Sequence, residues 1–535
     1  MDGVTRFGVG WPGGVNATAT VDAAGNKAWH LVRMAAAGFP VPPGFVLGTG
    51  FSRQVIDHGG LPDDLIDLLA AEVRGLEEAT GATFGGDRRP LLVSVRSGAA
   101  VSMPGMLETV LNVGLGPDAR SGLIRSTGYP RLFSDCQARL VRSYAETVAG
   151  LPAIDLDRTA ASVMARHGVR HEAELDTRGC DDLAAAFRAR YRDATGTEFP
   201  DDPMEQLVGA VEAVFRSWRS TRAVTYRRLH GLDDAGGTAV IVQAMVFGNR
   251  GADSGSGVAF SRNPATGEPE LYLDYLADAQ GEEVVSGRRS AFGVAELGIT
   301  APGLLDELTD TATRLEREFG DAQDFEFTVE AGRLWLLQTR AAKRTAWAAL
   351  RIAVDLAAEG IIDRRVALDR LAHRDVAAIS RTRLTPGSAR PLATAIPAGP
   401  GVAMGPIALT ARAATASAAA GAPAILVRPD TSTEDLAGMA AAAGILTRVG
   451  SRTSHAAVVA RQLDRTCLVG CDALEVDDDS GHCRLAGIEL REGDIITLDG
   501  DHGAVYLGSV PTVTERPTDL LARLDELRHE PVTTA

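Results

Sequence analysis

The 535-residue chain has little lysine, few cysteines and few aromatic residues. Of its 54 basic side chains only Lys27 and Lys343 are lysines, so each is a candidate for a position that needs a compact ammonium rather than a guanidinium. Five cysteines are an odd number and indicate reduced thiols, not a disulfide framework. The formal net charge of −16 argues against a nucleic-acid or anionic-membrane partner, because affinity for phosphate backbones comes from clustered basic residues.

Long apolar runs are missing as well. No stretch reaches the roughly 18–20 apolar residues that span a bilayer, and the first residues lack the basic start and apolar core of a signal peptide. We therefore expect a cytoplasmic protein without a membrane partner. A chain of this length is expected to form about two to four domains, because one hydrophobic core rarely serves so many residues.

Strand-like and helix-like segments alternate along the chain and predict a multidomain fold of the α+β and α/β classes. Up to about residue 340, apolar residues at three- and four-residue steps predict a helix over 204–230, and the same spacing predicts helices over 346–380. Ala331-Gly332 is typical of a hairpin turn. The predicted strands of this part are residues 90–96, 238–246, 325–330 and 334–338.

A segment rich in proline and glycine, residues 385–401, is typical of a linker. A smaller β/α unit follows it, with short strands predicted at 424–427, 494–498 and 504–507. The polar tail contains one short helix candidate at 520–527. The expected divisions are a first domain at 1–340, a helical linker region at 341–388, a small domain at 389–512 and a tail at 513–535.

The most distinctive segment is residues 450–461, where two hydroxyl residues precede small helix-forming residues. Thr453 or Ser454 fits a helix N-cap, which places His455 in the first turn. Free backbone N–H groups and the helix dipole favour an anion there, and a phosphorylated imidazole carries one. Histidine is also a nucleophile near neutral pH. Taken alone, the pattern fits a capping-region histidine without chemistry at least as well.

This segment closely resembles the phosphohistidine signature of the pyruvate phosphate dikinase family, in which a Thr-Ser-His-Ala-Ala helix start carries the catalytic histidine. There is one departure. The family usually has Gly-Gly-Met before Thr-Ser-His, where this chain has Gly450, Ser451 and Arg452. The added charge would aid phosphate binding or alter partner docking, and the loss of a glycine stiffens the loop. The segments around the signature also resemble the family. They are residues 425–428, 431–436, 444–447 and 467–471.

The resemblance extends to the family's ATP-grasp nucleotide-binding domain. Residues 25–45 look like its start, and Lys27 matches its phosphate-contacting lysine. Residues 94–109 match a strand and glycine-containing loop, in which Arg96 offers a bidentate fork for phosphate oxygens and Gly105 lets the backbone approach the nucleotide. The Ser-Met-Pro-Gly-Met string in this loop favours the dikinase over the related water-dependent synthases. Further nucleotide-binding candidates implied by the resemblance are Thr109, Gln243 and, on the adenosine side, Glu282.

Four polar residues on the predicted hairpin suit the phosphate end of a nucleotide. In strands of period two, Asp324 and Glu326 share a face, and so do Gln338 and Arg340. Carboxylate and amide oxygens facing phosphates suit Mg²⁺, with Glu326 and Gln338 as the expected ligands. Arg340 can stabilise charge on the transferring phosphoryl group, and Thr453 beside the histidine is a further catalytic candidate. The alternative is a solvated acidic strand face.

A zinc site is not expected. Cys467 and Cys471 have Cys-x₃-Cys spacing, but no second ligand pair lies nearby in the sequence. A buried strand and turn explains them better than metal ligation.

The resemblance covers about residues 5–512 and implies a phosphotransferase with paired acceptors. An ATP-grasp-like domain would bind MgATP, and His455 would attack the β-phosphoryl group, giving AMP and a pyrophosphorylated histidine. Inorganic phosphate or water would then take the outer phosphoryl group.

The family's barrel for pyruvate and phosphoenolpyruvate has no counterpart in these residues, which leaves three hypotheses. The barrel is a separate protein, or the chain is a dedicated kinase for another small-molecule acceptor, or it is a non-catalytic nucleotide-binding regulator. The intact set of Lys27, Arg96, Glu326 and His455 argues against the regulator.

Overall fold

The chain forms two compact units. The structure is a computed structural model. Its first unit consists of Met1–Gly255, Ala277–Ala279 and Thr328–Thr339. Its second unit consists of Ser256–Leu276, Gln280–Phe327 and Arg340–Ala535. No helix among the described residues is long and apolar enough to cross a membrane. The domain bounds expected from the sequence stay predictions. The residues that the structure describes are 3–11, 19–101, 108–229, 231–232, 236–286, 291–385, 387, 389–432, 435–452, 454–477 and 481–529.

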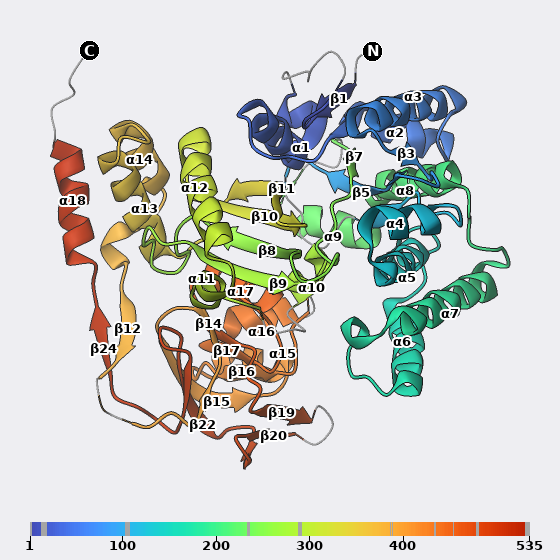
Figure 1. The fold of residues 1–535 in the computed structure, drawn as a ribbon. Coiled ribbons are helices and arrows are strands. Elements are labelled where there is room, and N and C mark those ends of the chain that lie inside the picture. Colours follow the sequence, from blue (N-terminus) through green and yellow to red (C-terminus); the bar gives the residue numbers. More distant parts are fainter. Residues whose placement is uncertain are drawn as a thin grey trace. The chain divides into compact units, whose positions relative to one another are not determined.

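The first unit is built around a five-stranded antiparallel sheet of order β1-β2-β7-β5-β6. The strands predicted at 90–96 and 238–246 are present as β5 and β7 (Figure 1), although Pro90 and Leu91 form a separate short strand, β4, that pairs with β3. The strands are β1 Val4–Phe7, β2 Gly44–Leu47, β3 Thr83–Phe84, β4 Pro90–Leu91, β5 Val93–Gly98, β6 Thr109–Val113 and β7 Ala239–Ala244. The helices are α1 Val21–Ala36, α2 Thr49–His58, α3 Asp63–Thr80, α4 Ala119–Thr127, α5 Pro130–Thr147, α6 Ala153–His167, α7 Thr177–Thr195, α8 Pro203–Ser217 and α9 Thr221–Leu229.

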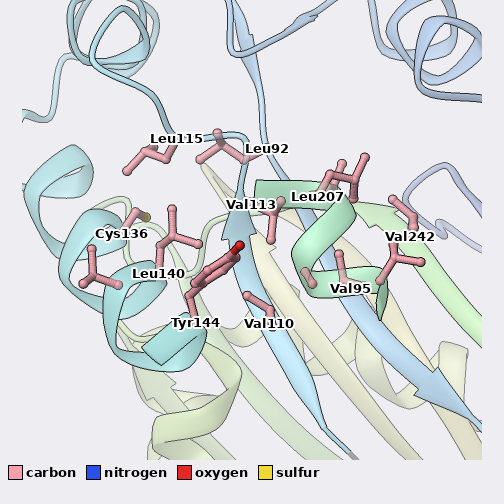
Figure 2. Close-up of a cluster of buried hydrophobic side chains, with 14 of the residues drawn as sticks. Leu92, Val95, Val110, Val113, Leu115, Cys136, Leu140, Tyr144, Leu207 and Val242 are labelled. Atoms are coloured by element: carbon pink, nitrogen blue, oxygen red, sulfur yellow. The ribbon is translucent and has the colours of Figure 1, made fainter. Parts of the chain in front are cut away.

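Apolar side chains of the sheet and of helices α5 and α8 form the core of this unit (Figure 2). Val95 of β5 and Val242 of β7 are fully buried, as are Leu140 of α5 and Leu207 of α8. Burying one such side chain contributes about 1.5–3 kcal/mol. This core therefore fixes strand β5, the strand that carries Arg96.

The helix predicted over 204–230 is broken into α8 and α9. Trp218 is the C-cap of α8, and α9 begins three residues later. The buried guanidinium of Arg227 donates to the carbonyl oxygen of Trp218 at 2.9 Å and lies 3.9 Å from the centre of its ring. The apolar spacing continues across the break, so periodicity alone did not show it.

Strands β8 to β11 form a second sheet of order β11-β10-β8-β9. The predicted hairpin is confirmed as β10 and β11, with Ala331 and Gly332 at positive φ in its turn. The strands are β8 Gly255–Phe260, β9 Tyr272–Ala277, β10 Gln323–Glu330 and β11 Arg333–Ala341. The nearby helices are α10 Gly281–Ser286, α11 Val294–Thr300 and α12 Pro302–Phe319.

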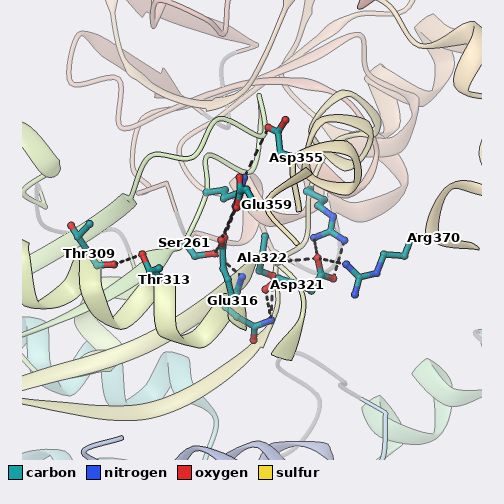
Figure 3. Close-up of polar contacts among 12 residues, drawn as sticks. Ser261, Thr309, Thr313, Glu316, Asp321, Ala322, Asp355, Glu359 and Arg370 are labelled. Atoms are coloured by element: carbon teal, nitrogen blue, oxygen red, sulfur yellow. Dashed lines mark hydrogen bonds and ion pairs between the residues drawn. The ribbon is translucent and has the colours of Figure 1, made fainter. Parts of the chain in front are cut away.

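A buried charged network ties the end of β8 to the neighbouring helices (Figure 3). Arg262 is 2% exposed and donates to Glu316 of α12 at 2.9 Å and to Glu359 at 2.6 Å. The hydroxyl of Ser261 also donates to Glu316, at 2.6 Å. Removing one partner of such a buried group leaves an uncompensated charge, so the network fixes the position of α12.

The helices predicted over 346–380 are α13 Ala346–Ala358 and α14 Arg364–Leu371. The tail helix is α18 Thr518–His529, and its Leu520 and Leu524 pack with Trp347 of α13. Strands β12 Arg381–Leu384 and β24 Thr512–Glu515 pair antiparallel. The chain thus enters and leaves the small domain through one two-stranded ribbon.

The small domain contains an eight-stranded sheet of order β13-β23-β22-β15-β16-β17-β18-β14. Its centre, β15 to β18, is parallel, with a helix in each of the three crossovers, and β19 to β21 form a separate three-stranded sheet. The strands are β13 Ala393–Thr394, β14 Ile396–Gly399, β15 Val402–Ala408, β16 Ile425–Arg428, β17 Gly444–Thr447, β18 Thr466–Val469, β19 Leu474–Asp477, β20 His482–Leu485, β21 Ile488–Arg491, β22 Ile495–Asp499 and β23 Ala504–Leu507. The helices are α15 Ala411–Ala419, α16 Leu436–Ala441 and α17 His455–Gln462.

Helix α1 is interrupted at Gly25, whose φ of 80° is left-handed. A Cβ at this position would lie 2.2 Å from the carbonyl oxygen of Gly98, and the next amide, that of Asn26, donates to Ala99 at 2.9 Å. Only glycine permits this approach of backbone to backbone. The contact brings the turn that carries Lys27 next to the end of the strand that carries Arg96.

We expect Gly25→Ala to destabilise the protein by more than the roughly 1–2 kcal/mol that a left-handed alanine costs, because the new methyl group also collides with the Gly98 carbonyl. Gly59→Ala is the matched control, since Gly59 has a φ of 84° and no described atom lies within 4 Å of the place that its methyl group would take. Urea unfolding of both variants measures the difference. Equal losses of stability would show that the close approach is unimportant.

Candidate active site

Arg96 and Thr109 are cross-strand neighbours in the first unit. They face each other in the register of β5 and β6, and Arg96 is half-buried whereas the other residues of β5 are buried. Its guanidinium donates to the carbonyl oxygen of Leu337 at 3.3 Å. With Lys27 held nearby by the Gly25 contact, two cations and a hydroxyl lie at one end of this sheet, an arrangement that suits phosphate oxygens.

Gln243 lies in the interior of β7. It is 2% exposed, and its amide nitrogen donates to the carbonyl oxygen of Pro42 at 3.1 Å. That nitrogen therefore serves the fold, and a nucleotide contact by Gln243 stays a prediction. Gln338 is half-buried in β11.

A second group of predicted residues lies in the second unit. Arg340 donates to Asp324 from Nε at 2.8 Å and lies 2.7 Å from it through Nη2, and Asp324 is 4% exposed. Burial alone lowers the pKa of Arg340, but the charges of Asp324 and Glu326 raise it above its ordinary value. Asp324 is therefore an ion-pair partner that orients Arg340. Glu326 is half-buried.

The oxygen chemistry of Glu326 fits a magnesium ion. Glu326 and Asp324 together carry one charge more than Arg340 neutralises, and Mg²⁺ binds through one or two carboxylates plus substrate phosphates. No three His, Cys, Asp or Glu side chains gather as metal ligands within the described ranges. The described residues therefore do not form a metal site from three or more such protein ligands.

Three other predicted residues complete the set. Glu282 is exposed on the short helix α10. Gly105 and Thr453 lie outside the residues that the structure describes.

His455 begins helix α17 at the carboxyl edge of the parallel strands. Ser454, one of the two residues that the sequence offered as N-cap, is the N-cap with φ −62° and ψ 164°, although its hydroxyl makes no capping bond. The helix follows β17, and the neighbouring strand β16 leads into Asp430 and Ser432. Ligands of α/β sheets bind at this edge, because the crossover loops meet there.

The imidazole of His455 is oriented by one hydrogen bond to the backbone of Ser432. Its Nε2 is buried and has no hydrogen-bond partner within the described ranges. The contact with Ser432 raises the pKa of the imidazole, as a backbone acceptor does. Nε2 is the candidate nucleophile, because no described side chain or backbone group occupies its lone pair.

Burial lowers the pKa of His455 below its ordinary value, and the carboxylates of Asp430 and Asp435 oppose this shift. The neutral imidazole is the nucleophilic form. Sequence reasoning missed Asp430 and Asp435 as influences on His455. Asp435 lay within a segment quoted for its resemblance, and the signal that could have found both is their position just after a predicted strand.

Comparison with known families assigns the two functional regions. Residues 53–291 match the AMP/ATP-binding domain of pyruvate phosphate dikinase, and residues 420–503, which include His455, match the mobile domain of PEP-utilising enzymes. The chain thus combines a nucleotide-binding domain of dikinase type with a mobile domain, and the mixed α/β multidomain fold expected from the sequence is confirmed.

The chain is a relative of the pyruvate phosphate dikinases. It is 42% identical over 493 residues to pyruvate, phosphate dikinase of Clostridium symbiosum, covering 91% of this chain and 56% of the relative. The enzyme of Rhizobium meliloti (strain 1021) is 41% identical over 504 residues, covering 92% and 56%. Pyruvate, phosphate dikinase 2 of Oryza sativa subsp. japonica is 42% identical over 493 residues, with the same coverage. The chain spans a little over half the length of these relatives.

We expect the His455 imidazole to titrate below pH 6.5, because its surroundings favour the neutral form. Asp430→Asn removes a charge that raises the pKa and should lower it further, whereas Asp472→Asn, which is not among the charges acting on His455, should leave it unchanged. NMR of histidine-labelled protein, assigned with His455→Ala, measures the midpoints. A midpoint at or above 6.5 contradicts the prediction.

Proposed function

We propose that this chain is an ATP-dependent phosphotransferase that phosphorylates its own His455 and passes the phosphoryl group on to pyruvate. The observation that carries the proposal is the imidazole itself. The ring contacts the backbone of Ser432 and its Nε2 is left without a partner among the described residues, in a domain of the kind that matches PEP-utilising enzymes.

The reaction that the resemblance implies balances as follows. Nε2 of His455 attacks the β-phosphorus of ATP, the bond to the α-phosphoryl oxygen breaks, and AMP leaves. Inorganic phosphate then attacks the outer phosphorus, pyrophosphate leaves, and His455 keeps one phosphoryl group. Helix α17 presents N-terminal N–H groups to the anion so formed.

The remaining predicted residues have supporting roles in this reaction. Lys27 and Arg96 would neutralise phosphate oxygens, and Arg340, oriented by Asp324, would stabilise charge on the transferring group. Glu326 and Gln338 would hold Mg²⁺, which supplies charge neutralisation at the phosphates when bound. Thr109, Gln243 and Glu282 remain candidates for contacts with the nucleotide, and Thr453 for catalysis.

Pyruvate is proposed as the final acceptor because the relatives are named for it. The barrel that binds it would be supplied outside these 535 residues, as a separate protein. Transfer to another small molecule is the alternative, and a non-catalytic regulator is the second alternative.

Incubation with β-³²P-labelled ATP, Mg²⁺ and phosphate should label the protein with an acid-labile, base-stable group. His455→Ala should abolish the label, because the accepting nitrogen is lost. His373→Ala, which changes an exposed histidine elsewhere, should retain it. If the wild-type protein stays unlabelled both with and without phosphate, the remaining hypothesis is a nucleotide-binding regulator.

The labelled protein then identifies the acceptor. Discharge by pyruvate only when a dikinase barrel is supplied supports the proposal. Discharge to another metabolite without the barrel would replace pyruvate transfer by a dedicated kinase.

The two lysines provide a matched pair of variants. Lys27→Met should slow the labelling of His455 by about 100-fold or more, because a charge that stabilises the transferring phosphates is lost. Lys343→Met removes the other lysine, which is exposed, and should label at the wild-type rate. Single-turnover labelling measures both rates. Equal rates in the two variants would exclude Lys27 from the reaction.

A further inference from the structure

Arg452, three residues before His455, makes an ion pair with strand β9. Its Nη1 donates to Oδ1 of Asp274 at 3.2 Å, and the Asp274 side chain is 1% exposed. The same guanidinium lies 5.7 Å from the centre of the Tyr272 ring. Tyr272 and Asp274 are two residues apart on β9 and so share a face of the strand. One cation thus contacts both a buried carboxylate and an aromatic ring.

Two further polar contacts join the histidine domain (residues 389–512) to this part of the second unit. Tyr272 donates its hydroxyl to the carbonyl oxygen of Pro397 at 2.9 Å. Ser451 donates to the carbonyl oxygen of Val284 at 3.2 Å. Both contacts are neutral, so the Arg452–Asp274 pair is the salt-sensitive one among these three.

A second guanidinium at the same contact is buried without full hydrogen bonding. Arg461 of α17 is 1% exposed and lies 5.3 Å from the centre of the Phe260 ring on β8. Its Nη1 donates to the carbonyl oxygens of Ala398 and Arg452, but Nε and Nη2 have no hydrogen-bond partner among the described residues. The two unsatisfied donors carry a desolvation cost, while the Phe260 ring and the charges of Asp274 and Asp324 attract the cation.

We infer that Arg452 is a positioning residue that holds helix α17, and with it His455, against strand β9 by charge. This inference rests on the proposed function, in which His455 receives a phosphoryl group from ATP and passes it to pyruvate. The family usually has methionine here, which would make the contact apolar and nearly independent of salt. In this chain the Arg452–Asp274 pair stabilises the docked domain by charge. The docked state therefore responds to ionic strength.

Hydrogen exchange of the full, unphosphorylated chain tests docking directly. In wild type, peptides covering α17 and β9 should be protected at about 0.1 M sodium chloride and lose part of that protection at about 1 M. The Debye length falls from about 10 to about 3 Å over this range, but a partly buried pair is screened less than an exposed one. Arg452→Met should exchange at least about 10-fold faster at the lower salt and show little salt dependence. Arg452→Lys should restore part of the protection.

Two further variants separate docking from folding. Asp274→Asn removes the other charge and should reproduce Arg452→Met. Arg412→Met removes an exposed arginine of α15 in the same domain and should behave as wild type at both salt concentrations. Wild-type protection and salt dependence in Arg452→Met would overturn the inference.

The labelling of His455 supplies the functional readout. Arg452→Met should slow single-turnover labelling by about the factor seen in exchange and leave the KM for ATP unchanged, because the nucleotide site is untouched. A raised KM with unchanged turnover would contradict a positioning role. If wild type is never labelled, the proposed function fails, and the exchange experiment still decides whether Arg452 holds the domain.

Discussion

The hydrogen bond between His455 and the backbone of Ser432 is the constraint on which the candidate chemistry depends. It exists because β16 and β17 are parallel neighbours, so the segments that leave them meet at one edge of the sheet. It orients the ring, while Nε2 has no hydrogen-bond partner among the described residues. Helix α17 can lie this close to the sheet because Ala456, Ala457 and Ala460 form its buried face.

Guanidinium groups do most of the charge pairing in this lysine-poor chain. Arg262 bridges two carboxylates, and Arg340 is held by Asp324. The planar fork of arginine suits such partly buried pairs, because it donates several bonds in a fixed geometry. Arg461 differs, because its Nη1 donates to carbonyl oxygens rather than to a carboxylate. The neighbouring carboxylates act on Arg461 through their charge. Where nearly every cation is arginine, the lysine at position 27 stays a candidate for a contact that needs a compact ammonium.

The sequence predicted local features well and distant ones poorly. Ser454 as N-cap and the hairpin of β10 and β11 follow from residues within a few positions of each other. The break at Trp218 depends on a bond from Arg227, which apolar spacing does not reveal. The Arg452–Asp274 pair joins residues 178 positions apart. Such a pair follows only from how the histidine domain packs on β9, which no local pattern encodes.

The electrostatic surroundings of His455 suit a transient carrier rather than a permanent phosphate site. In the proposed reaction the imidazole gains negative charge close to Asp430 and Asp435, whose carboxylates already influence its pKa. The N-terminus of α17 favours that charge, while the two carboxylates oppose it. Because the helix N-terminus attracts the phosphoryl group and the two carboxylates repel it, the group is neither tightly held nor excluded. A group held in this way keeps its tendency to move to the next acceptor, which is the property that a phosphoryl carrier requires.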